Sequence, residues 1–255
     1  MVSSLGFLFV TAIAFQTPTV QTANGLRPPT KTAPSDPAKS LTPEMRGDIF
    51  VARKMYRDAI EIYQQGPKDS AVVANKVGIA YHQLLELDAA GKWYQRAIKL
   101  NPQYAEAVNN LGTVYYAHKS YRRAISQYHR ALRITPDSAS IVSNLGTAYF
   151  ARKDYKDATL MYQRALALDP DVFEHHSSFG VLLQERTVDE RAKFHYYLAK
   201  TYAKAGMTDR AIQYIRKSLE EGFKEREKFT TDPEFASLKN NDEFKQLMAA
   251  EQKVL

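Results

Sequence analysis

The sequence predicts an all-α protein, a solenoid built from antiparallel helix pairs. The main observation is a period of 34 residues that six columns of residues share. A fixed period in this range is typical of a repeat architecture made of one supersecondary unit. The columns are Gly78, Gly112, Gly146 and Gly180; Tyr81, Tyr115 and Tyr149; Ala90, Ala124 and Ala158; Tyr94, Tyr128 and Tyr162; Ala97, Ala131 and Ala165; Pro102, Pro136 and Pro170. The second observation is that apolar residues recur at spacings of 3 and 4 within each period, as on helices.

The first element is an uncharged apolar run, "LGFLFVTAIAF", followed by no other apolar stretch before residue 40. It is shorter than the about 20 residues that span a bilayer, and Ala12-Ile13-Ala14 has the small-x-small pattern of a signal-peptide cleavage site. We therefore expect a signal peptide over residues 1–14 and export to the periplasm or the medium. The alternatives are a retained segment that tethers the protein to a membrane and a tail without a targeting role.

Residues 15–41 are rich in Pro, Thr and Ser and contain little that could be buried. Such a segment cannot offset the entropy lost on ordering, so we expect a disordered linker. Folded structure should begin at Thr42 and Pro43, because Thr is a good N-cap and Pro suits the first helical position.

The solenoid is predicted over residues 42–225. In the best-patterned unit, Gly112 and Ala124 allow its two helices to approach closely while Tyr rings fill the flanking gaps, and short polar turns such as "AHKS" join the helices. The Pro that ends each unit stops its second helix. The predicted units lie near 40–70, 71–104, 105–138 and 139–172, with an irregular one at 173–191 and a last one at 192–225.

The pattern slips after Pro170. Ala192, Tyr196 and Ala199 fit the second helix of one unit, yet residues from 192 onward fit better as the first helix of a new unit. Both registers hold if a helix at about 190–205 packs on 173–186 and on 208–221, which predicts an odd number of helices there. Residues 226–255 then predict capping helices that start near Asp232-Pro233 and Asp242, with four apolar residues that cover the open end of the solenoid. These residues are Phe235, Leu238, Phe244 and Leu247.

The 34-residue period with its Gly, Tyr, Ala, Tyr, Ala and Pro columns resembles the tetratricopeptide repeat (TPR). The resemblance covers most of the chain and is clearest for 71–104, 105–138 and 139–172. It implies a right-handed TPR-type α-solenoid that binds a protein or peptide in a concave groove lined by the first helices of successive units. We expect the protein to be bacterial, and to be exported because of its N-terminal apolar run. An extended peptide or a partner protein is the expected ligand, and a small-molecule substrate is not expected.

Candidate groove residues follow from the columns next to the packing stripe, since a neighbouring residue lies about 100° round the helix. Asn110 and Asn144 could hydrogen-bond a peptide backbone, and Tyr116 and Phe150 could cover apolar side chains of the ligand. The Asn pair resembles the asparagine ladder in the repeat domain of O-linked N-acetylglucosamine transferase. The whole predicted set is Asn75, Lys76, His82, Asn109, Asn110, Thr113, Tyr116, Ser143, Asn144, Thr147 and Phe150.

Two structural alternatives remain open at these positions. The asparagines could satisfy groups within the protein, and Tyr116 and Phe150 could pack between repeats. Lys76, Asn110 and Asn144 also form a fragment of the carboxylate clamp of some TPR proteins, but the second Lys and the Arg of that clamp are missing.

Composition excludes some other functions. The chain has no Cys, so it has no disulfide, thiolate nucleophile or Cys-ligated metal. No catalytic motif is present, and His175, His176 and His195 lack the acidic pattern of a metal site, so we expect no enzyme, no cofactor and no metal. The formal charge of +7 leaves two alternatives open. They are an envelope scaffold or homo-oligomer formed through the convex face, and a basic solenoid that binds nucleic acid or an anionic polymer.

Overall fold

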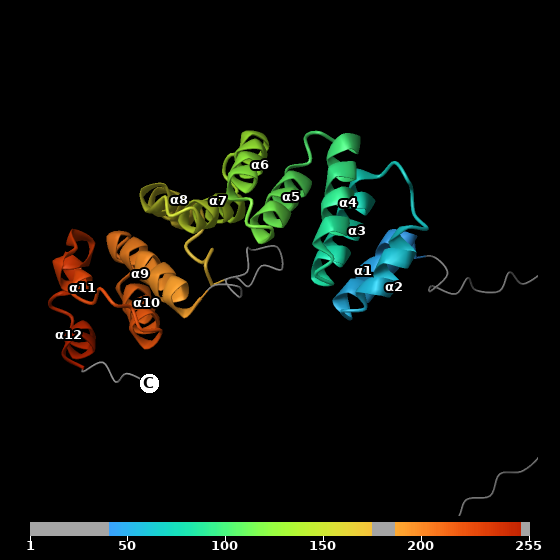
Figure 1. Ribbon diagram of the computed structural model, residues 1–255. Coiled ribbons are helices and arrows are strands. Elements are labelled where there is room, and N and C mark those ends of the chain that lie inside the picture. Colours follow the sequence, from blue (N-terminus) through green and yellow to red (C-terminus); the bar gives the residue numbers. More distant parts are fainter. Residues whose placement is uncertain (1–40, 175–186, 251–255) are drawn as a thin grey trace, which may run out of the picture. The chain divides into compact units, whose positions relative to one another are not determined.

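The computed structural model describes residues 41–174 and 187–250, which belong to one compact unit. These residues form helices joined by turns and contain no strand (Figure 1). The predicted signal peptide (1–14), nearly all of the predicted linker (15–41) and residues 175–186 lie outside the described part of the chain.

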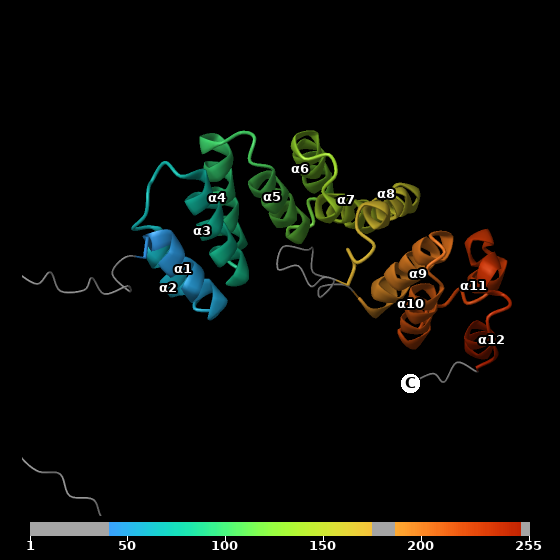
Figure 2. The same ribbon diagram turned by 180° about the vertical axis from the view of Figure 1, so that it is seen from behind.

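Four helix pairs follow one another along the first described segment. In each pair a turn of about three residues returns the chain, so the two helices are antiparallel neighbours, and both views show them side by side (Figures 1 and 2). The pairs are α1 (Pro43–Ala52) with α2 (Tyr56–Tyr63), α3 (Ala71–Gln83) with α4 (Leu87–Leu100), α5 (Ala105–Ala117) with α6 (Tyr121–Ile134), and α7 (Ala139–Ala151) with α8 (Tyr155–Leu168).

The first helix begins as its sequence predicts. The Thr42 side chain accepts a hydrogen bond from the backbone N–H of Met45 at 3.2 Å, and Pro43 occupies the first helical position. Thr42 therefore satisfies one of the backbone donors that the first turn of a helix leaves unpaired.

The turn inside each pair ends the first helix in the same way. At the end of α5, Lys119 has a left-handed φ of 57°, its N–H donates to the carbonyl of Tyr116, and the N–H of Ser120 donates to the carbonyl of Tyr115, both at 2.8 Å. This is the Schellman arrangement, which pairs the last carbonyls of a helix. The equivalent left-handed residues of the other turns are Lys54, Leu85, Lys153 and Gly206.

The packing inside each pair depends on a glycine that faces a tyrosine ring. A Cβ added to Gly112 would lie 2.7 Å from the ring of Tyr128, sixteen residues later on the partner helix. Such a distance is too short for any real Cβ contact, so only Gly fits there. The same spacing joins Gly47 to Tyr63, Gly78 to Tyr94 and Gly146 to Tyr162.

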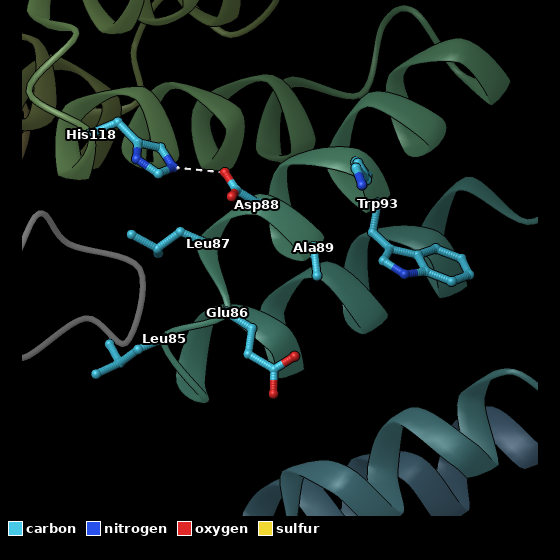
Figure 3. A pocket seen from close by; sticks show the side chains of 8 residues that line it. Leu85, Glu86, Leu87, Asp88, Ala89, Trp93 and His118 are labelled. Atoms are coloured by element: carbon cyan, nitrogen blue, oxygen red, sulfur yellow. Dashed lines mark ion pairs between the residues drawn. The ribbon is translucent and has the colours of Figure 1, made fainter.

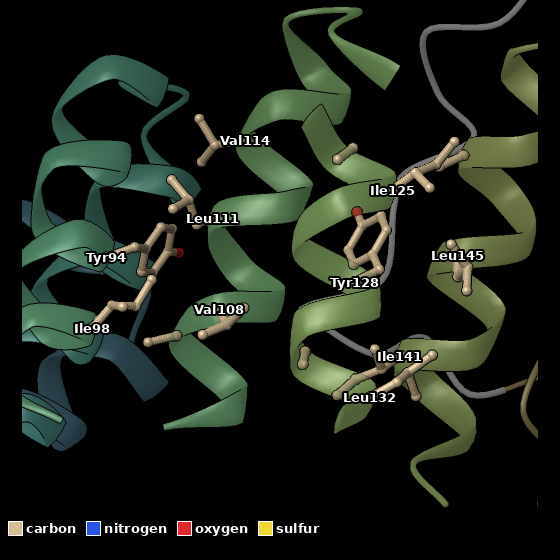
Figure 4. Packing of buried hydrophobic residues seen from close by; sticks show 14 of the residues in the cluster. Tyr94, Ile98, Val108, Leu111, Val114, Ile125, Tyr128, Leu132, Ile141 and Leu145 are labelled. Carbon is tan, nitrogen blue, oxygen red and sulfur yellow. The ribbon is translucent and has the colours of Figure 1, made fainter. Parts of the chain in front are cut away.

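The tyrosine rings then form part of a continuous apolar core. Tyr94 lies between α4 and α5 beside Leu111 and Val108, and Tyr128 lies beside residues of α7 such as Leu145 (Figure 4). All three of these apolar contacts join one pair to the next, so each pair contributes one face to the core of its neighbour.

The second described segment contains α9 (Val188–Lys204) and α10 (Thr208–Glu220), which pack on each other. Thr187 and Glu190 begin α9 with a reciprocal capping box. The contact with α10 agrees with the register in which residues from 192 onward start a new unit. The predicted helix at 173–186 lies almost wholly outside the described residues, so the other register stays a prediction.

The C-terminal cap consists of α11 (Lys228–Thr231), the 3-10 helix η3 (Pro233–Leu238) and α12 (Asp242–Ala249). The two expected starts at Pro233 and Asp242 are present, whereas α11 was not expected and η3 is a 3-10 helix. Phe235, Leu238 and Phe244 are buried, and Leu247 packs beside them. The cap is held to α9 through Asp232, which accepts hydrogen bonds from Tyr196 and from Lys200.

Substitution of Gly112 by Ala should destabilise the protein. Overpacking against Tyr128 costs about 1 to 3 kcal/mol, which exceeds the about 1 kcal/mol that Ala gains over Gly in a helix. Gly91→Ala in α4 is the matched control, because its added Cβ would meet only Val114 at an ordinary 3.5 Å, and it should stabilise. Urea denaturation of both variants tests this, and equal effects of the two substitutions would contradict it.

Candidate functional site

The first helices α3, α5 and α7 are joined by a chain of hydrogen-bonded side-chain amides. Asn144 donates to Asn109 at 3.0 Å, Asn109 donates to Asn110 at 3.3 Å, and Asn110 donates to Asn75 at 3.1 Å. These four side chains, which we call the amide chain, are only 1 to 6% exposed. Buried amides need such partners, so the amide chain holds each first helix against the next.

The amide chain ends on a carboxylate. The Asn75 amide donates to Glu106 at 3.0 Å and to the hydroxyl of Tyr104 at 3.3 Å, and that hydroxyl also donates to Glu106 at 3.2 Å. Burial, and then the charge of Glu106, raise the pKa of Tyr104 to about 12, so Tyr104 stays protonated and keeps donating at neutral pH.

This arrangement differs from the predicted peptide contact of the asparagines. The predicted asparagines do lie on the first helices, but their amides bond one another, twice between helices and once within α5, rather than pointing into solvent. They are Asn75, Asn109, Asn110 and Asn144. The physical reason is that equivalent positions on adjacent helices lie within reach of one another, so a buried amide finds its partner inside the protein.

The hydroxyl groups predicted to line the groove also donate hydrogen bonds within their own helices. Thr113 and Thr147 donate to the carbonyls of Asn109 and Ser143, four residues earlier on the same helix, and Thr113 accepts from the buried Tyr128 hydroxyl at 3.3 Å. Ser143 donates to the carbonyl of Ser140 at 2.9 Å and keeps part of its side chain exposed.

The two predicted aromatic positions differ in exposure. Phe150 is only 5% exposed, because the rings of Tyr155, Phe194 and Tyr197 lie 5.3, 5.4 and 5.8 Å from it. Helix α9 therefore covers Phe150, which the sequence had predicted to face the groove. Tyr116 stays half-buried, with its ring 5.4 Å from that of Tyr121.

The two predicted ionisable residues have partners within the chain. Lys76 pairs with Glu44 and Asp48 at 2.7 Å; burial alone would lower the pKa of Lys76, but the hydrogen bonds to these carboxylates raise it. His82 lies 3.5 Å from the Tyr94 hydroxyl, and burial lowers the pKa of His82 so that its ring is neutral near pH 7.

An arginine column that the sequence analysis missed links successive pairs. Arg96, Arg130 and Arg164 each donate to a backbone carbonyl 28 residues earlier, those of Lys68, Pro102 and Pro136. The three arginines keep the same period of 34 as the other columns, which was the available signal. Each one anchors the loop that leads into its own pair.

A hollow of about 550 Å3 lies at the turn between α3 and α4 (Figure 3). Leu85 at its edge is 74% exposed and has a left-handed φ of 61°, where three of the equivalent turns carry Lys. His118 pairs with Asp88 at 3.2 Å across the opening. Sequence reasoning did not find this hollow, because its lining comes from two turns and from one helix. The full lining is Leu85, Glu86, Leu87, Asp88, Ala89, Lys92, Trp93 and His118.

The described residues hold no group of three side chains suited to a metal ion. His195 instead lies 2.6 Å from Glu221, which also pairs with Arg191 at 3.1 Å. Burial lowers the pKa of His195 although Glu221 opposes the shift. His175 and His176 lie outside the described residues. None of the helices in the described part has the length and apolar character of a bilayer-crossing segment.

Comparison with protein families agrees with this geometry. A family described as "TPR repeat" matches residues 78–119, and families described as "Tetratricopeptide repeat" match residues 109–172 and 192–221. The chain is a tetratricopeptide repeat protein. The last match starts at residue 192, in the register that α9 and α10 adopt. These repeats support a protein-interaction scaffold in general.

A solved structure of another protein shares the fold. MamA (41 to the end) from Desulfovibrio magneticus RS-1 is 20% identical, with a TM-score of 0.50 over 74% of this chain and 97% of that one. Another crystal structure of MamA is 19% identical, with a TM-score of 0.49 over 69% of this chain and 93% of that one. No curated protein matched the chain.

Substitution of Asn110 by Ala should destabilise this TPR domain. It leaves the buried donor of Asn109 and the buried acceptor of Asn75 without their partner, and each such group costs roughly 1 to 3 kcal/mol. Thermal or urea unfolding measures the loss. The same substitution at the exposed Asn240 should have little effect, and an Asn110→Ala variant as stable as Asn240→Ala would contradict this role of the amide chain.

Proposed function

We propose that the protein is a non-enzymatic scaffold that binds an extended peptide or a partner protein along the face of α3, α5 and α7. The observation that supports this most is the amide chain, because it fixes three consecutive first helices against one another. Neighbouring helices lie roughly 8 to 10 Å apart, which matches about three residues of an extended chain. The face thus offers equivalent positions at a regular interval.

The amides set this interval, and other side chains make the contacts. His82 and Tyr116 occupy equivalent positions on α3 and α5, and both keep part of their surface exposed. A neutral imidazole ring and a phenol ring both combine apolar faces with a polar edge, which suits the side chains and backbone of a peptide. Lys76 and Ser143 add polar groups on α3 and α7.

We also propose that this binding takes place outside the cytoplasm, in the periplasm or the medium. The support for this is the apolar run over residues 5–15 with its small-x-small pattern at Ala12-Ile13-Ala14. The absence of Cys is compatible with either compartment.

A crosslinking pull-down from cell-envelope extract tests the proposed face. The double variant His82→Ala with Tyr116→Ala should lose a partner that the wild-type chain retains, while circular dichroism shows unchanged helicity. Tyr115→Ala is the matched control, because this ring is also half-buried but points about 100° away round α5, and it should keep the partner. A partner kept by the double variant would contradict binding at this face.

A further inference from the structure

Helix α6 carries an unusual concentration of positive charge. It contains four arginines and no acidic residue. The second helices on either side, α4 and α8, each carry an acid in the first turn, Asp88 and Asp157. We call the four side chains of α6 the basic stripe; they are Arg122, Arg123, Arg130 and Arg133.

The basic stripe faces away from the core. The buried residues of α6 centre on Tyr128, and Arg122, Arg123 and Arg133 are exposed. Arg122 and Arg133 are eleven residues apart, so they lie on nearly the same side of the helix and about 16 Å apart along its axis. A partner that lies along α6 therefore meets arginines over about three helical turns.

No carboxylate of the described residues pairs with this stripe. Arg130 donates to the carbonyl of Pro102, and the Arg123 guanidinium lies 5.9 Å from the centre of the Tyr115 ring. Arg122 and Arg133 have neither an ion pair nor a hydrogen bond to any of the described residues. The acid that follows α6, Asp137, lies 4.0 Å from Arg164 of α8 instead.

An uncompensated cluster of like charges costs stability. Like-charged neighbours on a helix are unfavourable, and here the effect reaches His129, whose pKa is lowered by burial and then by the charge of Arg133. Solubility alone would be served equally by mixed charges, as on α4 and α8. Arg122 and Arg133, which have no ion pair within the described part of the chain, therefore suit a partner that supplies negative charges.

We infer that the basic stripe of α6 docks an acidic segment of a protein partner. Guanidinium groups bind carboxylates through two parallel hydrogen bonds, which a row of arginines offers repeatedly. In an extended chain, acids at alternate positions lie on one side about 7 Å apart, so three of them span most of the distance between Arg122 and Arg133.

A protein segment fits this face better than nucleic acid does. Single strands bind where aromatic side chains alternate with the cations and stack on the bases. The aromatic residues of α6 are instead packed: Tyr128 is buried, and Tyr121 lies against Tyr116. Of the outward side chains between Arg122 and Arg133, Ser126 offers no stacking surface, and the His129 ring is already engaged by Tyr149, whose hydroxyl lies 3.0 Å from it.

The inference rests on the proposed function only in taking the partner to be a protein. Its site is a second helix, on different residues from the face of α3, α5 and α7. The two surfaces can therefore be tested with separate variants and separate readouts.

Fluorescence anisotropy with the full chain tests the inference. The probe is a labelled peptide of about ten residues in which Glu alternates with Ser, with the Gln-for-Glu peptide as its neutral counterpart. The test variant is Arg122→Gln with Arg133→Gln. The matched control is Lys99→Gln with Lys156→Gln, which removes the same charge from exposed positions of α4 and α8.

We expect the arginine variant to weaken binding of the acidic peptide about tenfold or more, and the lysine variant by less than about twofold. Arg122→Lys with Arg133→Lys should lie between them, because it keeps the charge and loses the paired hydrogen bonds. The neutral peptide should bind neither variant nor the wild-type chain.

Three results would overturn the inference. One is no binding of the acidic peptide by the wild-type chain, and another is equal weakening in the arginine and lysine variants. The third is tighter binding of a single-stranded oligonucleotide of equal charge that the arginine variant abolishes, which would make α6 a nucleic-acid surface. The His82→Ala, Tyr116→Ala variant should bind the peptide normally, so failure of the proposed face and failure of the α6 inference give different results.

Discussion

The fold depends on one contact that is repeated in every regular pair, a glycine of the first helix against the ring of a tyrosine sixteen residues later. The missing Cβ allows the ring to lie against the helix backbone, and the buried ring then reaches the next pair (Figure 4). In the last pair the same two positions are Ala199 and Ile215, both buried. There Ala199 is larger than the glycine of the other pairs, and Ile215 is smaller than their tyrosine. The combined volume of the two side chains is therefore what each pair must keep.

The hydrogen bonds of the amide chain fix the relative position of helices that this apolar packing brings together. Burial drives the pairs together without fixing their offset, whereas a hydrogen bond between Asn110 and Asn75 forms at one offset only. The asparagines that the sequence predicts to bind a peptide therefore hold adjacent first helices in register. The surfaces left for partners are the partly exposed side chains beside the amides and the outer face of α6. The arginines of that face pair with no carboxylate among residues 41–174 and 187–250.

Much of the fold could be predicted from the sequence, because the same residue types recur at the same positions of several repeats. The helix pairs and the buried tyrosine column follow from spacing, and the start at Thr42 follows from the capping preference of Thr before Pro. The side-chain partners do not, since Asn110 pairs with a residue 35 positions away on another helix. Phe150 is covered by Phe194 and Tyr197 of α9, and these positions are not related to Phe150 by the 34-residue period. The cap helix α11 has only four residues and too little pattern to be recognised.

A double-mutant cycle at Gly112 and Tyr128 tests most directly whether the glycine–tyrosine contact governs the pair. Unfolding free energies would be measured for Gly112→Ala, Tyr128→Ile, their combination and the wild-type chain. The account predicts that Gly112→Ala, destabilising on its own, becomes neutral or stabilising in the Tyr128→Ile background, because the obstructing ring is gone and Ala favours the helix. The same loss of stability in both backgrounds would show that the two positions act independently and would contradict the account.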